Sequence, residues 1–535
     1  MTGPTWQRAD EALAGLIDAA FWADPAGVLA QHGERIKSSA RHRETWRLPA
    51  GNGWVLVKQF ALATPASRLK WMLGLTAAQK EWRMLRLLRE RKVPVPAPVA
   101  LGMRPSRAGR MAWLVIEYVA DAVTFDRVNP PENTVAVCSG ARSLARAVAA
   151  MHVAGVSHRD LHSGNLLYQP QRDLWHITDF QRARAGRISR MELVDDLVQL
   201  QHCLGKKVEA GVRIVFLREY LWEFARLTGT EAGLTGREWR PLFGEIRSKS
   251  AAYVVEQAAA RCGRCMGTNR DVAPIARWAA PDDMPDGVLG GWICCGLSRT
   301  LLLDALALLG RENWHLEPDV VLVKNTRAAV TAVWTHPQGR LFIKERHSGG
   351  RLDRAKRLLG RAWLDRAWKA AWRLRYLHVS MPRPVMAVRT IHGDALVQAT
   401  LGDSASLDAV LRDTTARDLR VRARMIDAVA GGVGRLHDCG VVHGRLTTTR
   451  IFLVATGAHG SRAVFTGLDA ARFHRALTAG RRAEDLAPLY ALTFPFVSGA
   501  ERRQFLRRYL RAQSQPVHVR DLLLALVERA RHRLH

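Results

Sequence analysis

Residues 156–170 read VSHRDLHSGNLLYQP. Asp160 ends an HRD triplet, and Asn165 follows it five positions later. Further along the chain, Asp195 or Asp196 is expected to accept hydrogen bonds from this loop and support it from below. Phosphoryl transfer requires a residue that orients the attacking hydroxyl and oxygen ligands for magnesium, which aspartate and asparagine supply. The stretch therefore predicts the catalytic loop of a phosphotransferase. Its candidate catalytic residues are Asp160, which would accept or orient the hydroxyl proton, with His158, Arg159 and His162.

A second stretch, residues 441–455, repeats this frame as VVHGRLTTTRIFLVA. Arg445 stands where the first copy has its aspartate, and Arg450 stands where the first copy has its asparagine. A guanidinium group cannot accept a proton or bind magnesium, because it carries only hydrogen-bond donors and a permanent positive charge. We therefore predict that the second copy is catalytically inactive and that its two arginines attract an anion.

The two loops belong to a longer internal repeat. The strand-end residues Lys58 and Lys344 lie nearly as far apart in the chain as the loop histidines His158 and His443. Ordered matches at a nearly constant separation indicate a tandem duplication. The matched segments are 46–60 with 333–346, 95–102 with 381–388, 113–119 with 395–401, 149–160 with 434–445 and 177–183 with 467–473.

Each copy begins with β-hairpins and a helix, continues with a β-rich segment, and reaches its loop through a helix over 139–154 or 420–438. This is the order of a bilobal kinase fold. We predict an α+β protein with two tandem bilobal protein-kinase-like domains, each with a small β-rich lobe and a larger helical lobe. The predicted boundaries are an N-terminal helical extension at 1–34, an active domain at 35–260, a junction at 261–315 and a degenerate domain at 316–535.

Residues on both sides of the first loop can form a site for ATP and Mg²⁺. Lys58 ends the strand WVLVK, where its ammonium group can reach nucleotide phosphates, and Glu81 on the following helix is the candidate partner that holds it. Asn165 and Asp179 supply the oxygen ligands that Mg²⁺ prefers. No glycine-rich loop precedes the lysine. The remaining candidate nucleotide-binding residues are Glu117 and Val119, through backbone groups to adenine, and Lys37, Ser38 and Ser39, over the phosphates.

The formal net charge of +31 favours anionic partners such as nucleic acid, acidic lipid headgroups or phosphorylated glycans. The N-terminus lacks the basic start and apolar core of a signal peptide. The most apolar window, 288–309, is interrupted by Arg299 and Asp304, so we expect no spanning helix and a cytoplasmic protein.

The seven cysteines do not make a disulfide framework. Four of them are either buried thiols or zinc ligands: Cys262, Cys265, Cys294 and Cys295.

Together, HRDLHSGNLL, ITDFQRAR and the upstream KEWRMLRLLRERKVPVPAPVALG resemble the bacterial lipopolysaccharide core kinase family, over 35–205 and, in degraded form, over 320–490. The resemblance implies a eukaryotic-protein-kinase-like enzyme that uses ATP and Mg²⁺ to phosphorylate a heptose or Kdo sugar of the inner core. It also implies an anionic glycolipid substrate, peripheral contact with the cytoplasmic face of the inner membrane, and no role for nucleic acid as a partner.

Two other functions are compatible with parts of this pattern. A small-molecule phosphotransferase of the aminoglycoside or choline type shares the HxDLHxGN loop but lacks the DFQRAR ending. A non-catalytic nucleotide-binding scaffold would have no need of four intact polar positions, which are Lys58, Asp160, Asn165 and Asp179. The leading prediction is therefore a sugar kinase.

The second copy keeps the strand lysine as Lys344 and the metal-site aspartate as Asp469. Its counterpart of the helix glutamate falls on Ala367 or Ala371. We predict an ion pair between Arg450 and Asp469, which would close the former metal site.

A basic helix predicted over 351–377 carries tryptophans at 363, 368 and 372. Such a helix can lie at an anionic membrane surface, or its apolar side can pack on the small lobe while its arginines face water. Both interpretations give the second copy a structural or docking role.

Overall fold

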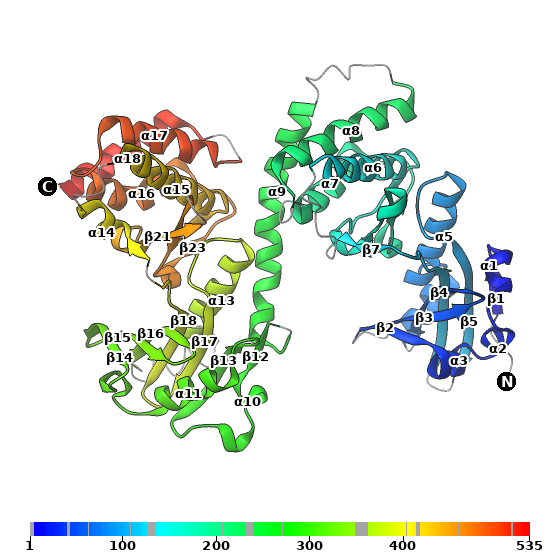
Figure 1. Ribbon diagram of the computed structural model, residues 1–535, viewed down its shortest axis with the longest axis horizontal. Coiled ribbons are helices and arrows are strands. Elements are labelled where there is room, and N and C mark those ends of the chain that lie inside the picture. The colour runs from blue at the N-terminus through cyan, green and yellow to red at the C-terminus, as the bar shows by residue number, and fades with distance from the viewer. Residues whose placement is uncertain are drawn as a thin grey trace. The chain divides into compact units, whose positions relative to one another are not determined.

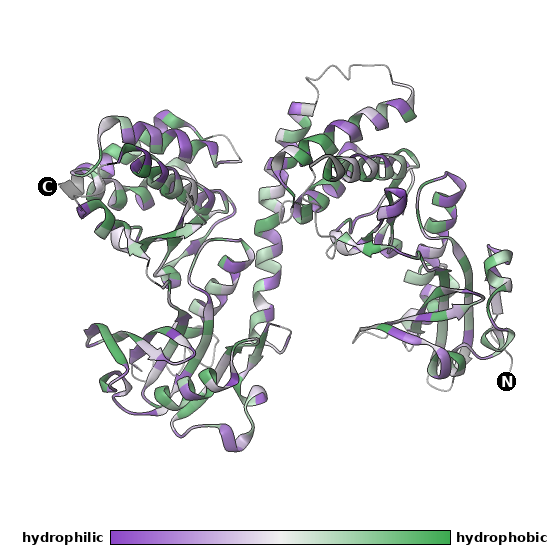
Figure 2. Cartoon of the chain, in the orientation of Figure 1, coloured by the Kyte–Doolittle hydropathy of each residue, from purple (hydrophilic) through white to green (hydrophobic). Residues whose placement is uncertain are grey.

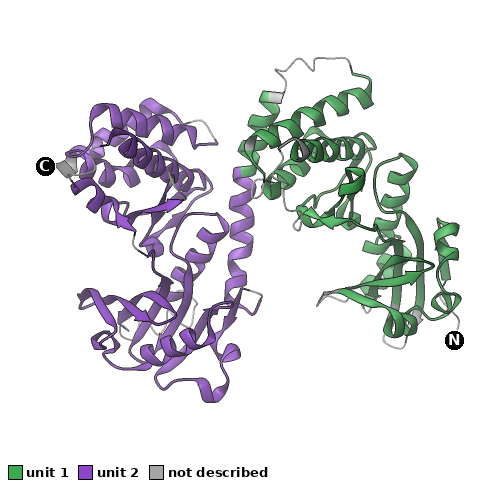
Figure 3. Cartoon of the chain, in the orientation of Figure 1, with its two compact units in different colours: residues 1–250 green, residues 251–535 purple. Residues whose placement is uncertain are grey.

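The chain forms two compact units, residues 1–250 and 251–535, and both mix helices with antiparallel strands (Figure 3). The division falls within one long helix, α9 (Trp239–Cys262). The mixture of helix and sheet agrees with the predicted α+β class. The computed structural model describes residues 5–39, 43–62, 64–106, 109–125, 134–204, 208–230, 239–269, 271–347, 362–402, 404–413, 418–456, 460–514 and 517–534.

The first unit contains a six-stranded antiparallel sheet in the order β1-β5-β6-β4-β3-β2 (Figure 1). Successive side chains of a strand point to opposite faces, and in β4 this buries Val55 and Val57 on one face. The strands are β1 (Thr5–Arg8), β2 (Glu34–Ser39), β3 (Arg43–Ala50), β4 (Gly53–Leu62), β5 (Pro98–Ser106) and β6 (Gly109–Glu117).

Three short N-terminal helices, drawn in blue in Figure 1, pack on this sheet. Phe21 and Trp113 are buried in the core that the helices and the sheet share. The predicted helical extension over 1–34 thus contains these helices together with β1, which pairs with β5. The helices are α1 (Glu11–Gly15), α2 (Ala19–Ala23) and α3 (Pro25–His32).

Two further helices, α4 (Pro65–Met72) and α5 (Ala77–Glu90), follow β4. Each begins with a capping box, in which the side chains of the N-cap residue and of the third helical residue bond reciprocally to backbone N–H groups. Helix α5 buries Ala78, Glu81, Leu85 and Leu88, whose spacing of three or four residues places them on one face. This face fixes the orientation of the glutamate.

The rest of the first unit is mainly helical, and α6 packs along α8 (Figure 1). Two small sheets, β10-β9-β7 and β11-β8, hold the loop of 156–170. The elements are β7 (Val123–Thr124), α6 (Thr134–Val153), β8 (Val156–Ser157), β9 (Leu166–Gln169), β10 (Leu174–Ile177), β11 (Arg184–Ala185), α7 (Arg190–Leu204) and α8 (Ala210–Thr228).

The second unit contains a seven-stranded antiparallel sheet in the order β12-β13-β17-β18-β16-β15-β14. The segment 261–315, predicted as a junction, lies in this unit and supplies two of these strands and helix α11, whose leucines pack on the sheet. The seven strands of the sheet and the two helices beside it are β12 (Val272–Pro274), α10 (Ile275–Trp278), β13 (Val288–Cys294), α11 (Arg299–Gly310), β14 (Val320–Thr326), β15 (Ala329–His336), β16 (Gly339–His347), β17 (Pro384–Thr390) and β18 (Gly393–Ala399).

The described end of the predicted basic helix is α13 (Trp363–Tyr376), and residues 351–361 lie outside the described residues. Trp368 and Trp372 are 0% and 1% exposed and pack with Cys265 and Cys294 against the sheet. The membrane interpretation is therefore wrong for these two tryptophans, because the small lobe covers them.

All seven cysteines are free thiols, and burial raises the pKa of Cys265 to about 12.

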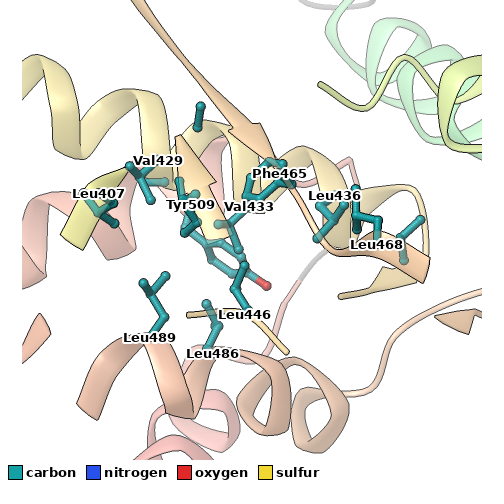
Figure 4. Packing of buried hydrophobic residues seen from close by; sticks show 14 of the residues in the cluster. Leu407, Val429, Val433, Leu436, Leu446, Phe465, Leu468, Leu486, Leu489 and Tyr509 are labelled. Carbon is teal, nitrogen blue, oxygen red and sulfur yellow. The ribbon is translucent and has the colours of Figure 1, made fainter. Parts of the chain in front are cut away.

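The helical part of the second unit packs around one apolar core (Figure 4). Tyr509 lies near its centre among leucines and valines, and burying each leucine or valine side chain stabilises the fold by about 1.5–3 kcal/mol. The elements are β19 (Ala405–Ser406), α14 (Leu407–Arg412), α15 (Leu419–Asp438), β20 (Val441–Val442), β21 (Ile451–Thr456), β22 (Gly460–Phe465), β23 (Arg472–Phe473), α16 (Ala479–Thr493), α17 (Gly499–Arg511) and α18 (Val519–Leu534).

Hydrophilic and hydrophobic residues are mixed along the helices of both units (Figure 2). None of the helices in the described part of the chain is both long enough and apolar enough to span a bilayer. The apolar window 288–309 is divided between β13 and α11.

Candidate active site

A buried ion pair joins the sheet of the first unit to helix α5. Nζ of Lys58 lies 2.5 Å from Oε1 of Glu81, and the two residues are 6% and 0% exposed. The pairing predicted for these side chains is present, whereas Glu90 on the same helix is exposed. Because an unpaired charge is costly in a buried site, the carboxylate holds the ammonium group in a defined position.

The other carboxylate oxygen of Glu81 has a partner that the sequence reasoning missed. Nε2 of Gln181 donates a hydrogen bond to Oε2 of Glu81 over 3.2 Å. Gln181 lies in the DFQRAR segment, two positions after Asp179, where protein kinases carry glycine. The contact ties this segment to α5, and the unusual glutamine was the signal that could have revealed it.

The loop of 156–170 is held from below by Asp196 of α7. Its carboxylate accepts hydrogen bonds from the backbone N–H groups of His158 and Arg159, each over 2.7 Å, and from the hydroxyl of Ser157 over 3.0 Å. Burial acts to raise the pKa of Asp196, but the contacts with His152 and the two N–H groups outweigh burial and lower it. The structure therefore selects Asp196 of the two predicted aspartates.

Asp160 and Asn165 are joined through the backbone of the loop. Nδ2 of Asn165 donates to the carbonyl oxygen of Asp160 over 3.0 Å, so the amide oxygen is directed away from this contact. Asn165 is buried, while the side chain of Asp160 is 35% exposed and lies 3.6 Å from Nη1 of Arg182. An aspartate in this position is accessible to a hydroxyl group.

Asp179 follows strand β10 and adopts a φ of +66°, an uncommon conformation for a residue with a side chain. Its carboxylate lies 3.7 Å from Nη1 of Arg43 on β3. Thr178 just before it donates its backbone N–H to the carbonyl oxygen of Asn165 over 2.9 Å. The two predicted metal ligands are thus on adjacent, hydrogen-bonded segments.

The two candidate histidines are structural parts of the loop. His158 is fully buried, its Nε2 contacts the carbonyl oxygen of Thr178 over 3.0 Å, and burial lowers its pKa. Nδ1 of His162 accepts a hydrogen bond from the backbone N–H of Gly164 over 3.0 Å. Arg159 has a φ of +61° and pairs with Glu192 over 2.9 Å. These contacts hold the three residues in the loop that carries Asp160.

The remaining candidates lie in the small lobe. Glu117 ends β6, and both its N–H and its carboxylate bond to the backbone of Ala97, at 2.8 and 2.9 Å. Val119 is buried just after the strand. The backbone of 37–39 belongs to β2, and the side chains of Lys37, Ser38 and Ser39 lie outside the described residues.

The second unit repeats the brace beneath its own loop. Asp485 of α16 accepts hydrogen bonds from the backbone N–H groups of His443 and Gly444, each over 2.8 Å. His437 contacts both this carboxylate, at 3.1 Å, and the hydroxyl of Tyr509, at 2.8 Å. The first unit has the same three-residue arrangement in Asp196, His152 and Tyr220. The support of the loop is therefore retained although the loop residues differ.

In the second unit, Asp469 forms a different ion pair from the predicted one. Oδ2 of Asp469 lies 2.6 Å from Nζ of Lys344 and accepts a hydrogen bond from Nε1 of Trp363 over 3.3 Å. The predicted pairing of Asp469 with Arg450 is wrong. Small side chains replace the helix glutamate, since Ala367 and Ala371 are both buried on α13. Lys344 pairs with the aspartate instead.

A family model described as lipopolysaccharide kinase (Kdo/WaaP) matches residues 21–226 and, separately, residues 312–509. The chain belongs to the Kdo/WaaP lipopolysaccharide kinase family. The predicted family resemblance is confirmed, and the double match agrees with a tandem duplication. Membership also confirms the predicted enzyme class, a phosphotransferase with a sugar hydroxyl as acceptor, and a kinase family implies ATP as the donor.

Relatives of this Kdo/WaaP-family chain include the 3-deoxy-D-manno-octulosonic acid kinase of Xanthomonas campestris pv. campestris (strain B100). The two are 28% identical over 189 residues, which is 33% of this chain and 68% of the relative. The enzyme of the same name from Stenotrophomonas maltophilia (strain K279a) is 29% identical over equal shares. A solved structure, WaaP in complex with acyl carrier protein, has 24% identity and a TM-score of 0.30, and covers 41% of this chain and 93% of that one.

Proposed function

We propose that the first unit transfers the γ-phosphoryl group of ATP to a sugar hydroxyl of the lipopolysaccharide inner core, on a Kdo or heptose residue. The observation that carries this proposal is the buried Lys58–Glu81 ion pair, next to a loop that presents Asp160. The relatives named as 3-deoxy-D-manno-octulosonic acid kinases support Kdo as the acceptor.

In this proposal each residue of the first unit has one task. The carboxylate of Asp160 orients the acceptor hydroxyl and takes its proton as the new O–P bond forms and the bond between the γ-phosphorus and the β–γ bridging oxygen breaks. Lys58 places positive charge on the phosphates, and Glu81 keeps it there. Backbone groups of 117–119 face adenine, and residues 37–39 cover the phosphates. His158, Arg159 and His162 position the loop.

The donor set suits Mg²⁺. Asn165 uses its amide nitrogen within the loop, which leaves its oxygen as a ligand, and Asp179 offers a carboxylate from the adjacent segment. Both are hard oxygen ligands of the kind that Mg²⁺ prefers beside nucleotide phosphates. Arg43 and Arg182 lie near the two aspartates at ion-pair distances, so cationic charge already accumulates around these carboxylates. Bound Mg²⁺ would neutralise charge that develops on the transferred phosphoryl group.

We also propose that the chain is a tandem pair of bilobal protein-kinase-like domains and that the second is catalytically inactive. The repeated brace beneath the loop supports a common fold. Arg445 and Arg450 support the loss of catalysis, because neither can take a proton or bind a metal ion. A structural or docking role remains for the second domain.

Contact with the cytoplasmic face of the inner membrane would bring the enzyme to a glycolipid substrate. The net charge of +31 suits anionic headgroups. On α4 and just after it, Leu69, Met72 and Leu73 are 56%, 75% and 61% exposed, beside exposed Arg68 and Lys70. Apolar side chains flanked by cationic ones are typical of segments that lie at a membrane surface.

The test is phosphate analysis of core oligosaccharide from cells that carry the wild-type gene, no gene, or the Asp160→Ala variant. Phosphate on an inner-core sugar should be present only with the wild-type gene. Unchanged phosphate in all three would refute the proposal. Transfer by the purified protein to aminoglycosides or choline, with unchanged core phosphate, would identify a small-molecule phosphotransferase instead.

A further inference from the structure

The second unit contains a large cleft with a volume of about 1180 Å³. It is lined by the sheet strands, by α13 and by the loop of 441–455. Sites for small ligands in proteins typically measure about 300–1,000 Å³. The loss of the catalytic residues has therefore not been accompanied by closure of the cleft, which has room for a ligand of substantial size.

One end of the cleft is strongly basic. Lys344, Arg445 and Arg450 lie there, and the cleft as a whole is lined by seven lysines or arginines and two aspartates. Among the described residues no carboxylate forms an ion pair with either arginine of the loop, because Asp469 is taken by Lys344. The guanidinium group of Arg450 is half-buried, and burial together with Arg445 lowers its pKa. Two neighbouring guanidinium groups that have no carboxylate at ion-pair distance form a site for an anion.

The backbone beside Arg450 leaves space for this side chain. Gly467 has a φ of +71°, and a Cβ atom there would lie 1.8 Å from Nη1 of Arg450. Another residue at this position would therefore displace the guanidinium group. The guanidinium group of Arg450 therefore lies directly against the backbone of this turn.

The other end of the cleft is apolar. Val333 of β15 and Phe342 of β16, which face each other across the two strands, line it, together with the chain of 398–401 that leaves the sheet. The sequence repeat matches this stretch with 116–119, the backbone segment expected to face adenine in the first unit. A slot with apolar walls and nearby backbone groups suits a planar heterocyclic base.

We propose that this cleft binds a nucleoside triphosphate without a divalent cation, with the base at the apolar end and the phosphates on Lys344, Arg445 and Arg450. Arg445 and Arg450 stand where the first unit has its catalytic aspartate and a predicted metal ligand. Their guanidinium groups supply the positive charge that magnesium would otherwise bring. Binding at this site does not depend on phosphoryl transfer by the first unit, so this proposal is independent of the proposed function.

The proposal is tested by isothermal titration of the full chain with AMP-PNP in EDTA. The background variant Lys58→Ala/Asp179→Ala removes the proposed nucleotide contacts of the first unit. We expect one binding site in this background, with affinity that does not rise when MgCl₂ replaces EDTA. Arg445→Ala, at an exposed position, and Arg445→Ala/Arg450→Ala should each weaken binding by at least about tenfold, because charge-assisted hydrogen bonds to phosphate are lost.

Arg507→Ala on α17 is the matched control, since it removes an equally charged, exposed side chain that does not line the cleft. Binding that is absent in EDTA, that needs Mg²⁺, or that survives Arg445→Ala unchanged would overturn the proposal. Tripolyphosphate that binds as tightly as AMP-PNP, with no competition from adenosine, would overturn the assignment of a nucleoside. Competition by adenosine, with weaker binding of tripolyphosphate, would support it.

Discussion

Replacing Glu81 by Gln should open the small lobe of the first unit locally. The substitution keeps the size of the side chain but leaves the ammonium group of Lys58, 6% exposed, without its carboxylate partner at 2.5 Å. Breaking a buried ion pair by removing one partner typically costs about 3–5 kcal/mol. Since about 1.4 kcal/mol is a factor of ten, protection of the backbone amides of α5 against hydrogen exchange should fall by at least about a hundredfold.

Hydrogen exchange followed by mass spectrometry measures this effect segment by segment in the full chain. Peptides from α5 and β4 should lose protection, while peptides from α15 in the second unit serve as an internal reference. Glu90→Gln is the matched control, because Glu90 lies on the same helix but is exposed. Lys58→Met combined with Glu81→Leu should recover much of the protection, since an apolar pair leaves no charge buried. Wild-type protection in Glu81→Gln would refute the reasoning that the pair is a strong, desolvated contact.

Three further outcomes are expected. Asp160→Ala should abolish phosphoryl transfer while circular dichroism and melting stay unchanged, and transfer at the wild-type rate would contradict its proposed role. The pKa of Asp196 is lowered in the folded state, so its stabilising effect is present at neutral pH and is lost as the pH falls below about 4; Asp196→Asn should flatten the acid-side fall in hydrogen-exchange protection of 156–160. Arg445→Asp with Arg450→Asn should show no turnover in an Asp160→Ala background, because the second unit lacks a glutamate partner for its lysine; measurable turnover would show a dormant kinase.

Much of the fold and of the candidate site follows from local pattern. The loop of 156–170, its altered repeat and the strand-end lysines are contiguous motifs whose spacing is set by short loops and hairpins. The pairing of Lys58 with Glu81 could also be predicted, because the capped helix α5 has one acidic residue on its apolar face. A charge on an apolar face needs a buried partner, and Lys58 is the cation that the preceding strand offers.

The sequence by itself determined the repeat, the family and the candidate residues, because these depend on residue type and on separation along the chain. The tertiary structure decided contacts between segments far apart in sequence. Asp469 pairs with Lys344 rather than with Arg450, because α13 carries alanines where the first unit has the glutamate partner of its lysine. Arg445 and Arg450 instead line an open cleft. Gln181 contacts Glu81 although 100 positions separate them in the chain, and Trp368 and Trp372 of α13 pack onto the sheet. Such choices depend on distances and desolvation in the packed chain, which no local pattern encodes.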